Sequence, residues 1–269
     1  MKGPYFILLA IVLLSSIRVQ GLDIACLEDG NCPTTSELYN DNKWWKKRLV
    51  VTDDIWNKID CPVIFSKPRP IHNESTWKLL REAYQNIVGS ESTLNLTNPD
   101  SGFNVNFNVQ QSKTKGRAVY AAEPVKKGEL IWTATRQSAR FKDGASYKEF
   151  LTSIPIDLAC DVIQWAYVQS FDKNEVQNMG FGDQIEEELF LLICVDLDEG
   201  SFMNGSREDP PNVGLVNEAG SKFPAGWRQS YLALHNINVG EEFVVDYGQF
   251  AIPYGWKWFG LEKKEPRFQ

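Results

Sequence analysis

The sequence predicts a mostly β fold interrupted by one helical insertion, a β+α class, and three patterns support this prediction. Residues 103–109 alternate apolar and polar side chains, as a half-buried strand does. Short apolar segments separated by turns return towards the C-terminal end of the chain. Between these regions, an apolar stripe at helical spacing begins shortly after Pro155. This order is typical of a domain built from short strands.

The predicted strands follow from the positions of turn-forming residues. A turn at 113–116 ends the alternating segment, and a second turn follows at 124–128. The run 189–195 is continuously apolar, so we expect this strand to be buried on both faces. Besides 103–109, the predicted strands are 117–121, 129–132, 189–195, 213–217, 229–234 and 243–247.

Two helical regions are expected. The first begins near Ser75, which is a suitable N-cap residue, and its apolar positions are Trp77, Leu80, Ala83, Tyr84 and Ile87. The second is the insertion at about 137–190, with a core-facing stripe of Leu158, Val162, Trp165 and Ala166. Residues 89–102 are rich in Gly, Ser, Thr, Asn, Pro and Asp, so we place a linker and a domain boundary there.

Composition limits the classes of partner. Hydrophobic residues make up 43% and charged residues 23% of the chain, which excludes wholesale disorder. The net charge of -7 disfavours direct binding to nucleic acid, because phosphate groups would be repelled. A basic protein or peptide would instead be attracted.

The N-terminal residues resemble a cleavable leader. Lys2 supplies a positive charge, 5–14 is an apolar run, and 19–21 ends in small residues. We therefore expect a signal peptide over 1–21, with a signal anchor as the alternative. No other stretch is apolar enough to span a bilayer, so the mature chain is expected to leave the membrane and be secreted or luminal. Glycosylation sequons begin at Asn73, Asn95 and Asn204.

The cysteines and histidines predict no metal site. None of the cysteines forms a CxxC pair or a zinc signature, and the two histidines are far apart. A zinc hydrolase or a Ser/His triad therefore lacks support. We expect one disulfide among Cys26, Cys32 and Cys61, and buried thiols at Cys160 and Cys194.

Three segments near the C-terminal end follow one another in a recognisable order. The first, 116–121, is Gly-Arg-Ala-Val-Tyr-Ala. The second, 198–206, is Asp-Glu-Gly-Ser-Phe-Met-Asn-Gly-Ser and is followed by Pro211-Asn212. The third, 238–248, is Asn-Val-Gly-Glu-Glu-Phe-Val-Val-Asp-Tyr-Gly. In this order they resemble the motifs of the SET domain, over about 103–262. We place the SET domain at 101–262, after a flanking region at 22–100 and before a tail at 263–269.

This resemblance implies a SET fold of short curved sheets, with a knot-like crossing near the C-terminus. It also implies lysine methylation with S-adenosylmethionine as the cofactor. Tyr247 is the implied catalytic residue, because its hydroxyl can hold the transferring methyl in line with the incoming nitrogen. The implied cofactor-binding residues are Gly116, Arg117, Ala118, Asn204, Gly205 and Tyr247.

The aromatic C-terminal segment has two interpretations. Phe250, Tyr254 and Trp256 can form a substrate channel, in which desolvation lowers the pKa of the acceptor lysine from its free value of about 10.4. These side chains, with Trp258 and Phe259, can equally form a hydrophobic clasp. The two interpretations are compatible.

The chain also departs from the SET motifs. Ala118 replaces the second glycine of the opening motif, Gly205 replaces a histidine, and no cysteine follows Ser206. The cysteine cluster of a zinc-bound post-SET module is not found after the third motif. We therefore predict a lysine methyltransferase acting on a non-histone protein. The alternative is a catalytically inactive SET fold that serves as a luminal binding module.

One conflict arises at Asn204, because it is both a sequon and an implied cofactor-binding residue. A glycan on this side chain would fill the cofactor pocket. A working enzyme and a glycosylated Asn204 therefore exclude each other.

Overall fold

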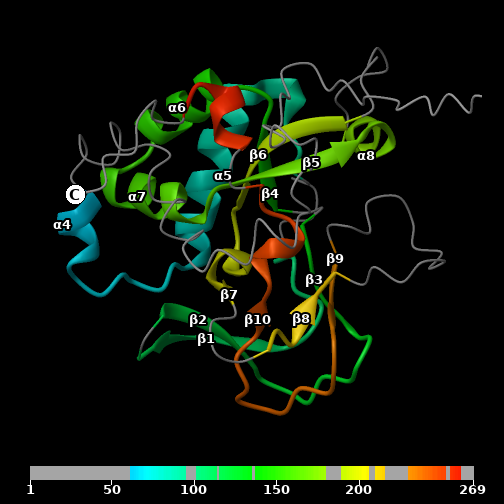
Figure 1. Cartoon of the computed structure of the whole chain (residues 1–269). Helices are drawn as coiled ribbons and strands as arrows, with labels where there is room; N and C mark the ends of the chain where they lie inside the picture. The colour runs from blue at the N-terminus through cyan, green and yellow to red at the C-terminus, as the bar shows by residue number, and fades with distance from the viewer. Residues whose placement is uncertain are drawn as a thin grey trace, which may run out of the picture. The chain divides into compact units, whose positions relative to one another are not determined.

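The strands of the computed structural model form three sheets within the residues it describes (Figure 1). These residues are 61–94, 101–113, 115–134, 137–179, 189–205, 210–215, 230–252 and 255–261, and all of them belong to one unit, Pro33–Gln269. The predicted signal peptide and C-terminal tail lie outside them. The mixed, strand-rich architecture confirms the predicted fold class, whereas the knot-like crossing stays a prediction.

A two-stranded hairpin opens the SET segment. Strand β1 (Phe107–Ser112) pairs antiparallel with β2 (Gly116–Ala121), and Gly116 at the turn has a φ of 79°. A residue with a side chain is strained in this left-handed region, which explains the glycine. The strand predicted over 103–109 begins later than expected, because Phe103 makes only an isolated bridge to Trp132.

The five-stranded sheet brings distant motifs together. Strand β10 (Val244–Val245) runs parallel to β7 (Asn204–Gly205) and to β8 (Val213–Gly214). Strand β9 (Ser230–Ala233) joins β8 to β3 (Leu130–Thr133). The strand expected over 243–247 is shorter than predicted, because Tyr247 already begins a 3₁₀ turn, η4 (Tyr247–Gln249).

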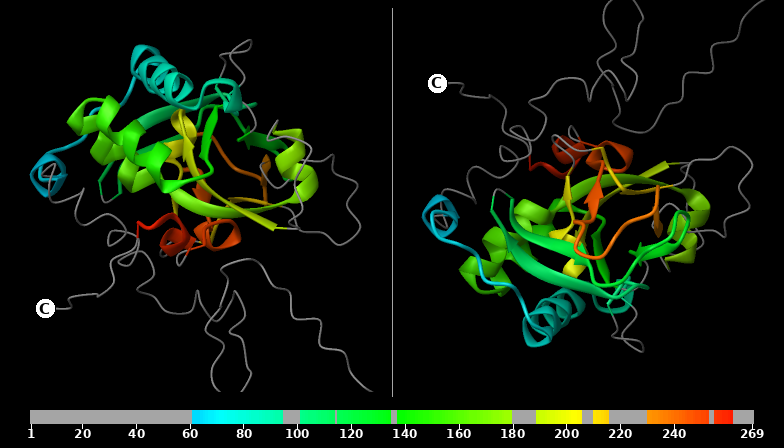
Figure 2. Two further views of the ribbon diagram at one scale, coloured as in Figure 1. Left: turned by 90° about the horizontal axis from the view of Figure 1, so that it is seen from above. Right: turned by 90° about the horizontal axis from the view of Figure 1, so that it is seen from below.

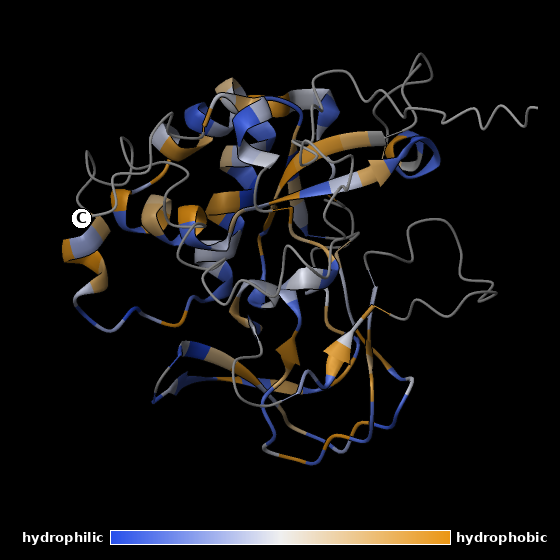
Figure 3. Cartoon of the chain, in the orientation of Figure 1, coloured by the Kyte–Doolittle hydropathy of each residue, from blue (hydrophilic) through white to orange (hydrophobic). Residues whose placement is uncertain are grey.

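The three-stranded sheet corrects the predicted helical insertion. Its central strand, β6 (Leu189–Asp196), is the apolar strand expected over 189–195, and it is orange along most of its length in Figure 3. Its neighbours β4 (Ser138–Phe141) and β5 (Tyr167–Asp172) lie within the region predicted as helical. Every residue of β4 is buried, and β5 is buried at most positions. Buried strands lack the alternating pattern by which a strand is recognised, so they were missed.

Helices gather on one side of this sheet, and α8 (Lys173–Asn178) lies at the other (Figure 2). The gathered helices are α5 (Glu74–Val88), α6 (Gly144–Ser153) and α7 (Ile156–Trp165). The helix predicted near Ser75 is confirmed as α5, but its N-cap is Asn73, which accepts a hydrogen bond from the Thr76 amide. The Ser75 hydroxyl donates to the Asn73 side chain instead, at 2.6 Å. Across the described ranges, every helix falls short of what a membrane crossing requires.

A disulfide joins the flanking region to the insertion. Cys61, at the start of α4 (Cys61–Phe65), is bonded to Cys160 in α7. The prediction of a buried thiol at Cys160 is therefore wrong, because a pairing across 99 residues leaves no local pattern. Cys194 is a free, buried thiol, as expected. Burial raises its pKa to about 12, so this thiol is protonated at neutral pH.

Beside this disulfide, Asp161 is fully buried and binds two arginines and a histidine. Arg117 and Arg69 each donate two hydrogen bonds to its carboxylate, at 2.8–3.0 and 3.0–3.1 Å. His72 Nε2 lies 2.8 Å from the same carboxylate. Burial alone would raise the pKa of Asp161, but the hydrogen bonds from His72, Arg117 and Arg69 outweigh burial and hold it well below its usual range. Asp161 thereby ties together the flank, α7 and β2.

We predict that Asp161→Asn lowers the free energy of unfolding at pH 7 by about 3 kcal/mol, because buried arginines lose their counter-charge. Urea denaturation measures this change. Since the native pKa is depressed, the ionised carboxylate contributes fully above its unfolded pKa of about 4, and its contribution is lost as pH falls towards the native pKa.

The difference in free energy of unfolding between wild type and Asp161→Asn should therefore become smaller below about pH 4. The exposed pair of Lys78 and Glu82 offers a matched control, in which Glu82→Gln should change stability by less than about 0.5 kcal/mol. Equal stability of Asp161→Asn and wild type at pH 7 would contradict the role given to Asp161.

Candidate functional site

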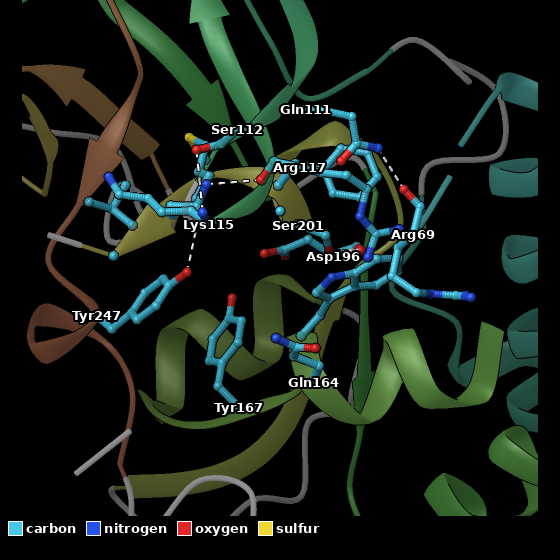
Figure 4. A pocket seen from close by; sticks show the side chains of 18 of the residues that line it. Arg69, Gln111, Ser112, Lys115, Arg117, Gln164, Tyr167, Asp196, Ser201 and Tyr247 are labelled. Atoms are coloured by element: carbon cyan, nitrogen blue, oxygen red, sulfur yellow. Dashed lines mark hydrogen bonds between the residues drawn. The ribbon is translucent and has the colours of Figure 1, made fainter. Parts of the chain in front are cut away.

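A pocket of about 900 Å³ collects most of the residues that the sequence singled out (Figure 4). It is bounded by the turn of the β1–β2 hairpin, by the chain from η2 (Glu199–Phe202) to β7, and by the chain that follows β10. The predicted site residues that line it are Gly116, Arg117, Asn204, Gly205, Tyr247 and Phe250. The segments around Asn204 and Tyr247 thus converge on one space.

The side-chain amide of Asn204 is fixed in one orientation. Its Nδ2 atom donates to the Arg117 carbonyl at 2.9 Å and to Glu242 Oε1 at 3.1 Å. Both partners are acceptors, so only the NH₂ group can face them. Glu242 is itself held by Lys115, whose Nζ lies 3.3 Å away. Among the described residues, Asn204 Oδ1 has no hydrogen-bond partner, which makes it the atom that can accept a hydrogen bond from a ligand.

Tyr247 lies directly against the backbone of Gly205. A Cβ atom at position 205 would come within 2.7 Å of the Tyr247 ring, which is closer than real Cβ contacts allow. With the Tyr247 ring in this position, any side chain at position 205 would overlap it, so glycine at this position suits the observed ring. The Tyr247 hydroxyl donates its proton to the Met203 carbonyl at 2.9 Å. Towards a bound ligand, this oxygen can act only as an acceptor.

The other residues of the opening motif have separate roles. Ala118 pairs with Gln110 in the β1–β2 ladder, is fully buried and does not line the pocket. Its extended backbone does not require glycine, so this second departure leaves the pocket unchanged. Arg117 lines the pocket, but its guanidinium group binds Asp161, and it stacks over Phe202 at 4.7 Å.

One end of the pocket is aromatic. The Phe250 ring contacts Tyr167, Tyr231 and Tyr247, with ring centroids 4.8, 5.8 and 5.8 Å apart. Figure 4 shows the hydroxyl groups of Tyr167 and Tyr247 directed into the pocket. Burial, and secondly the charge of Asp196, raises the pKa of Tyr167 and of Tyr231 well above 10, so both hydroxyls stay protonated.

One of the other predicted channel residues lies elsewhere. Trp256 is buried in the core against Tyr147, 5.9 Å between ring centroids, and does not line the pocket. The burial of Trp256 agrees with the second interpretation of this segment, in which its aromatic side chains form a hydrophobic clasp. Tyr254 lies outside the described residues. Sequence reasoning missed Tyr167 and Tyr231 as pocket residues, although Tyr231 lies in a predicted strand.

Another part of the pocket wall is basic and includes the flanking region. Phe65–Arg69 forms part of its wall, and no sequence pattern had indicated a role for this segment. The basic lining residues are Lys67, Arg69, Lys113, Lys115 and Arg117. The disulfide and the Asp161 cluster hold this wall in place.

Neither histidine lines the pocket. His72 belongs to the Asp161 cluster, and His235 is exposed, with Nδ1 2.9 Å from the Asn236 carbonyl. Within the described ranges, no group of three or more His, Cys, Asp or Glu side chains is arranged to hold a metal ion.

Residues 116–248 match the family model of the SET domain, and they include all three motif segments. The chain therefore carries a SET domain.

The chain also matches solved structures, each at low identity. They include the Neurospora SET domain protein DIM-5, a histone lysine methyltransferase, at 18% identity and a TM-score of 0.32, over 54% of this chain and 53% of that one. CpSET8 from Cryptosporidium matches at 18% and 0.31, over 67% and 69% of the two chains. The chain of ctPRC2 bound to S-adenosylmethionine matches at 15% and 0.33, over 60% and 17%. No curated protein sequence matches the chain.

We predict that Gly205→Ala displaces the Tyr247 ring and weakens its hydrogen bond to Met203, because the new Cβ would overlap the ring. NMR of tyrosine-labelled protein should show a changed Tyr247 ring environment. Gly128→Ala is the control, since Gly128 has a left-handed φ of 82° but no atom within 4 Å of its Cβ position. It should cost about 1 kcal/mol of stability and leave the Tyr247 signals unchanged. Unchanged Tyr247 signals in Gly205→Ala would refute the steric argument.

Proposed function

We propose that this chain is an S-adenosylmethionine-dependent protein-lysine N-methyltransferase that acts on a non-histone protein. The observation that carries the proposal is the convergence of Asn204, Gly205 and Tyr247 on one pocket. These residues come from two SET motifs, and β7 and β10 place them side by side by their parallel pairing.

The residues of the pocket fit the proposed cofactor. Asn204 Oδ1 is an acceptor suited to the cofactor's ammonium group. Lys67 and Lys113, which also line the pocket, suit its carboxylate. When bound, the sulfonium supplies an already activated methyl group.

Under this proposal, the protein contributes alignment and desolvation. The Tyr247 oxygen, with its proton committed to Met203, is suited to accept weak C–H···O contacts. Phe250, Tyr167 and Tyr231 exclude water from the position that the acceptor nitrogen would occupy. Desolvation favours the neutral amine, which is the nucleophilic form.

The compartment and the substrate class follow from two further features. The leader and the Cys61–Cys160 disulfide both favour an oxidising compartment, either luminal or extracellular. The acidic chain, with a net charge of -7, would attract a basic protein substrate. A substrate met in such a compartment is not a chromatin-bound histone.

A catalytically inactive SET-fold binding module is the second candidate. The secretory leader favours it, because a lumen is an unusual place for this cofactor. The departures at Ala118 and Gly205 favour it less than the sequence alone suggested, since both residues have local structural explanations.

Calorimetry with S-adenosylmethionine and a methyl-transfer assay on a peptide array distinguish the candidates. We expect saturable cofactor binding, and a fall in turnover of at least about a hundredfold in Tyr247→Phe with cofactor affinity nearly unchanged, since this oxygen acts in the transition state. Asn204→Ala should weaken cofactor binding. If wild type fails to bind the cofactor at millimolar concentration, the methyltransferase proposal falls and the binding module remains.

Peptide mapping without reduction tests the proposed compartment. In protein recovered from a secretory expression host, we expect a Cys61–Cys160 cross-link and a glycan on the exposed Asn73. Asn204 should carry no glycan, because its amide is hydrogen-bonded inside the fold. A glycan on Asn204, or reduced Cys61 and Cys160, would argue against a folded, active protein in this compartment.

A further inference from the structure

The second SET segment contains an Asn-Gly pair, Asn204-Gly205, which is the only such pair in the sequence. The SET motif has a histidine at the second position, so the pair arises where Gly205 replaces it. Asparagine is a thermolabile residue. It is most labile before glycine, because glycine has no side chain to shield its backbone nitrogen and leaves the backbone free to rotate. The pair is therefore a candidate modification site.

The reaction is deamidation, and it needs only these two residues and water. The Gly205 backbone nitrogen attacks Cγ of Asn204, a new C–N bond closes a five-membered imide, and the Cγ–Nδ2 bond breaks. Nδ2 leaves as ammonia and takes the proton of the Gly205 amide with it. Water then opens the imide at either carbonyl, which yields aspartate or isoaspartate. Both residues line the pocket, so water reaches them whenever no ligand fills it.

Strand β7 keeps both residues out of the geometry that this reaction requires. Its parallel pairing with β10 sets Asn204 beside Val244 and Gly205 beside Val245, and it holds the backbone extended. Ring closure requires the backbone at Asn204 to rotate out of the extended conformation, so that Cγ meets the next nitrogen. The Tyr247 ring packs against Gly205 and further restricts its movement.

The leaving group is anchored as well. Nδ2 of Asn204 donates to the Arg117 carbonyl at 2.9 Å and to Glu242 Oε1 at 3.1 Å. These bonds break when the side chain turns onto the Gly205 nitrogen. Glu242 is held in turn by Lys115, and these two side chains are only 17% and 18% exposed. Local opening of β7 and β10 is therefore the event that releases the reaction.

We propose that Asn204 is a deamidation site, held back by the β7–β10 pairing and by the hydrogen bonds of its amide, whose product cannot return to the same contacts. A carboxylate has no proton to donate, so it would face the Arg117 carbonyl and the Glu242 carboxylate without a hydrogen bond. Isoaspartate also adds one carbon to the main chain and displaces the β7 register. The proposal does not rest on the proposed function, because deamidation requires neither cofactor nor substrate.

A comparison of folded and unfolded protein tests the restraint by the fold. The full chain is incubated in mildly alkaline buffer with and without urea, and peptide mapping separates asparagine, aspartate and isoaspartate at position 204. We expect first-order loss of Asn204 in the unfolded chain, and a loss at least about tenfold slower in the folded chain. Equal rates, or no isoaspartate at this position in the unfolded chain, would overturn the proposal.

Glu242→Ala tests the anchoring of the leaving group, because it removes one of the two acceptors and keeps the Asn-Gly pair. Deamidation of this folded variant should be at least about threefold faster than that of folded wild type, whereas the rate in urea should be unchanged. The exposed control Glu82→Ala should match wild type in both conditions. An unchanged folded rate in Glu242→Ala counts against the proposal. If this variant does not fold, the wild-type comparison decides.

Asn204→Asp tests whether the product fits the fold, since it reproduces one deamidation product directly. Its midpoint of urea denaturation at neutral pH should lie below that of wild type, because two hydrogen bonds are lost and two carboxylates meet. Asn236→Asp is the matched control, because Asn236 Oδ1 accepts from the Lys127 amide at 2.9 Å and aspartate can accept the same bond. Its midpoint should equal that of wild type. An equal midpoint for Asn204→Asp would show that the product fits, contrary to the proposal.

Discussion

The candidate site depends on the parallel pairing of β10 with β7. This pairing sets Val244 beside Asn204 and Val245 beside Gly205, so the turn that follows β10 carries Tyr247 onto the Gly205 backbone. The buried Asn212 holds β10 from its other side. Its side chain accepts from the Val244 amide and donates to the Glu242 carbonyl, both at 2.8 Å. The Asn212 side-chain amide thus forms hydrogen bonds of the kind that a neighbouring backbone would form, and these bonds reinforce β10, which is only two residues long.

Sequence reasoning predicted this convergence because the SET motifs are local and ordered. It also placed β6 correctly, since a long run of apolar, strand-forming residues leaves few alternatives. It failed where the structure depends on tertiary burial. Strands β4 and β5 are covered on both faces and therefore show no alternation, and Tyr167 was lost from the predicted site with them.

Contacts between residues that are far apart in the sequence could not be predicted either. Cys61 and Cys160 are 99 residues apart, and Asp161 reaches back to Arg69 and His72 across 92 and 89 residues. The sequence therefore predicted only a flanking region at 22–100, with no part in the site. In the structure, the same contacts give Phe65–Arg69 a fixed place in the pocket wall. A buried carboxylate such as Asp161 needs cationic partners, and Arg69 of the flank is one of them. This contact holds the flank at the site.

The charged residues that line the pocket come from separate parts of the fold. The basic residues belong to the flank and to the hairpin, whereas Asp196 ends the central strand of another sheet. Tyr247 lines the same pocket and presents a hydrogen-bond acceptor to it. A wall built from separate elements fixes its polar groups relative to one another, and fixed groups orient whatever binds between them.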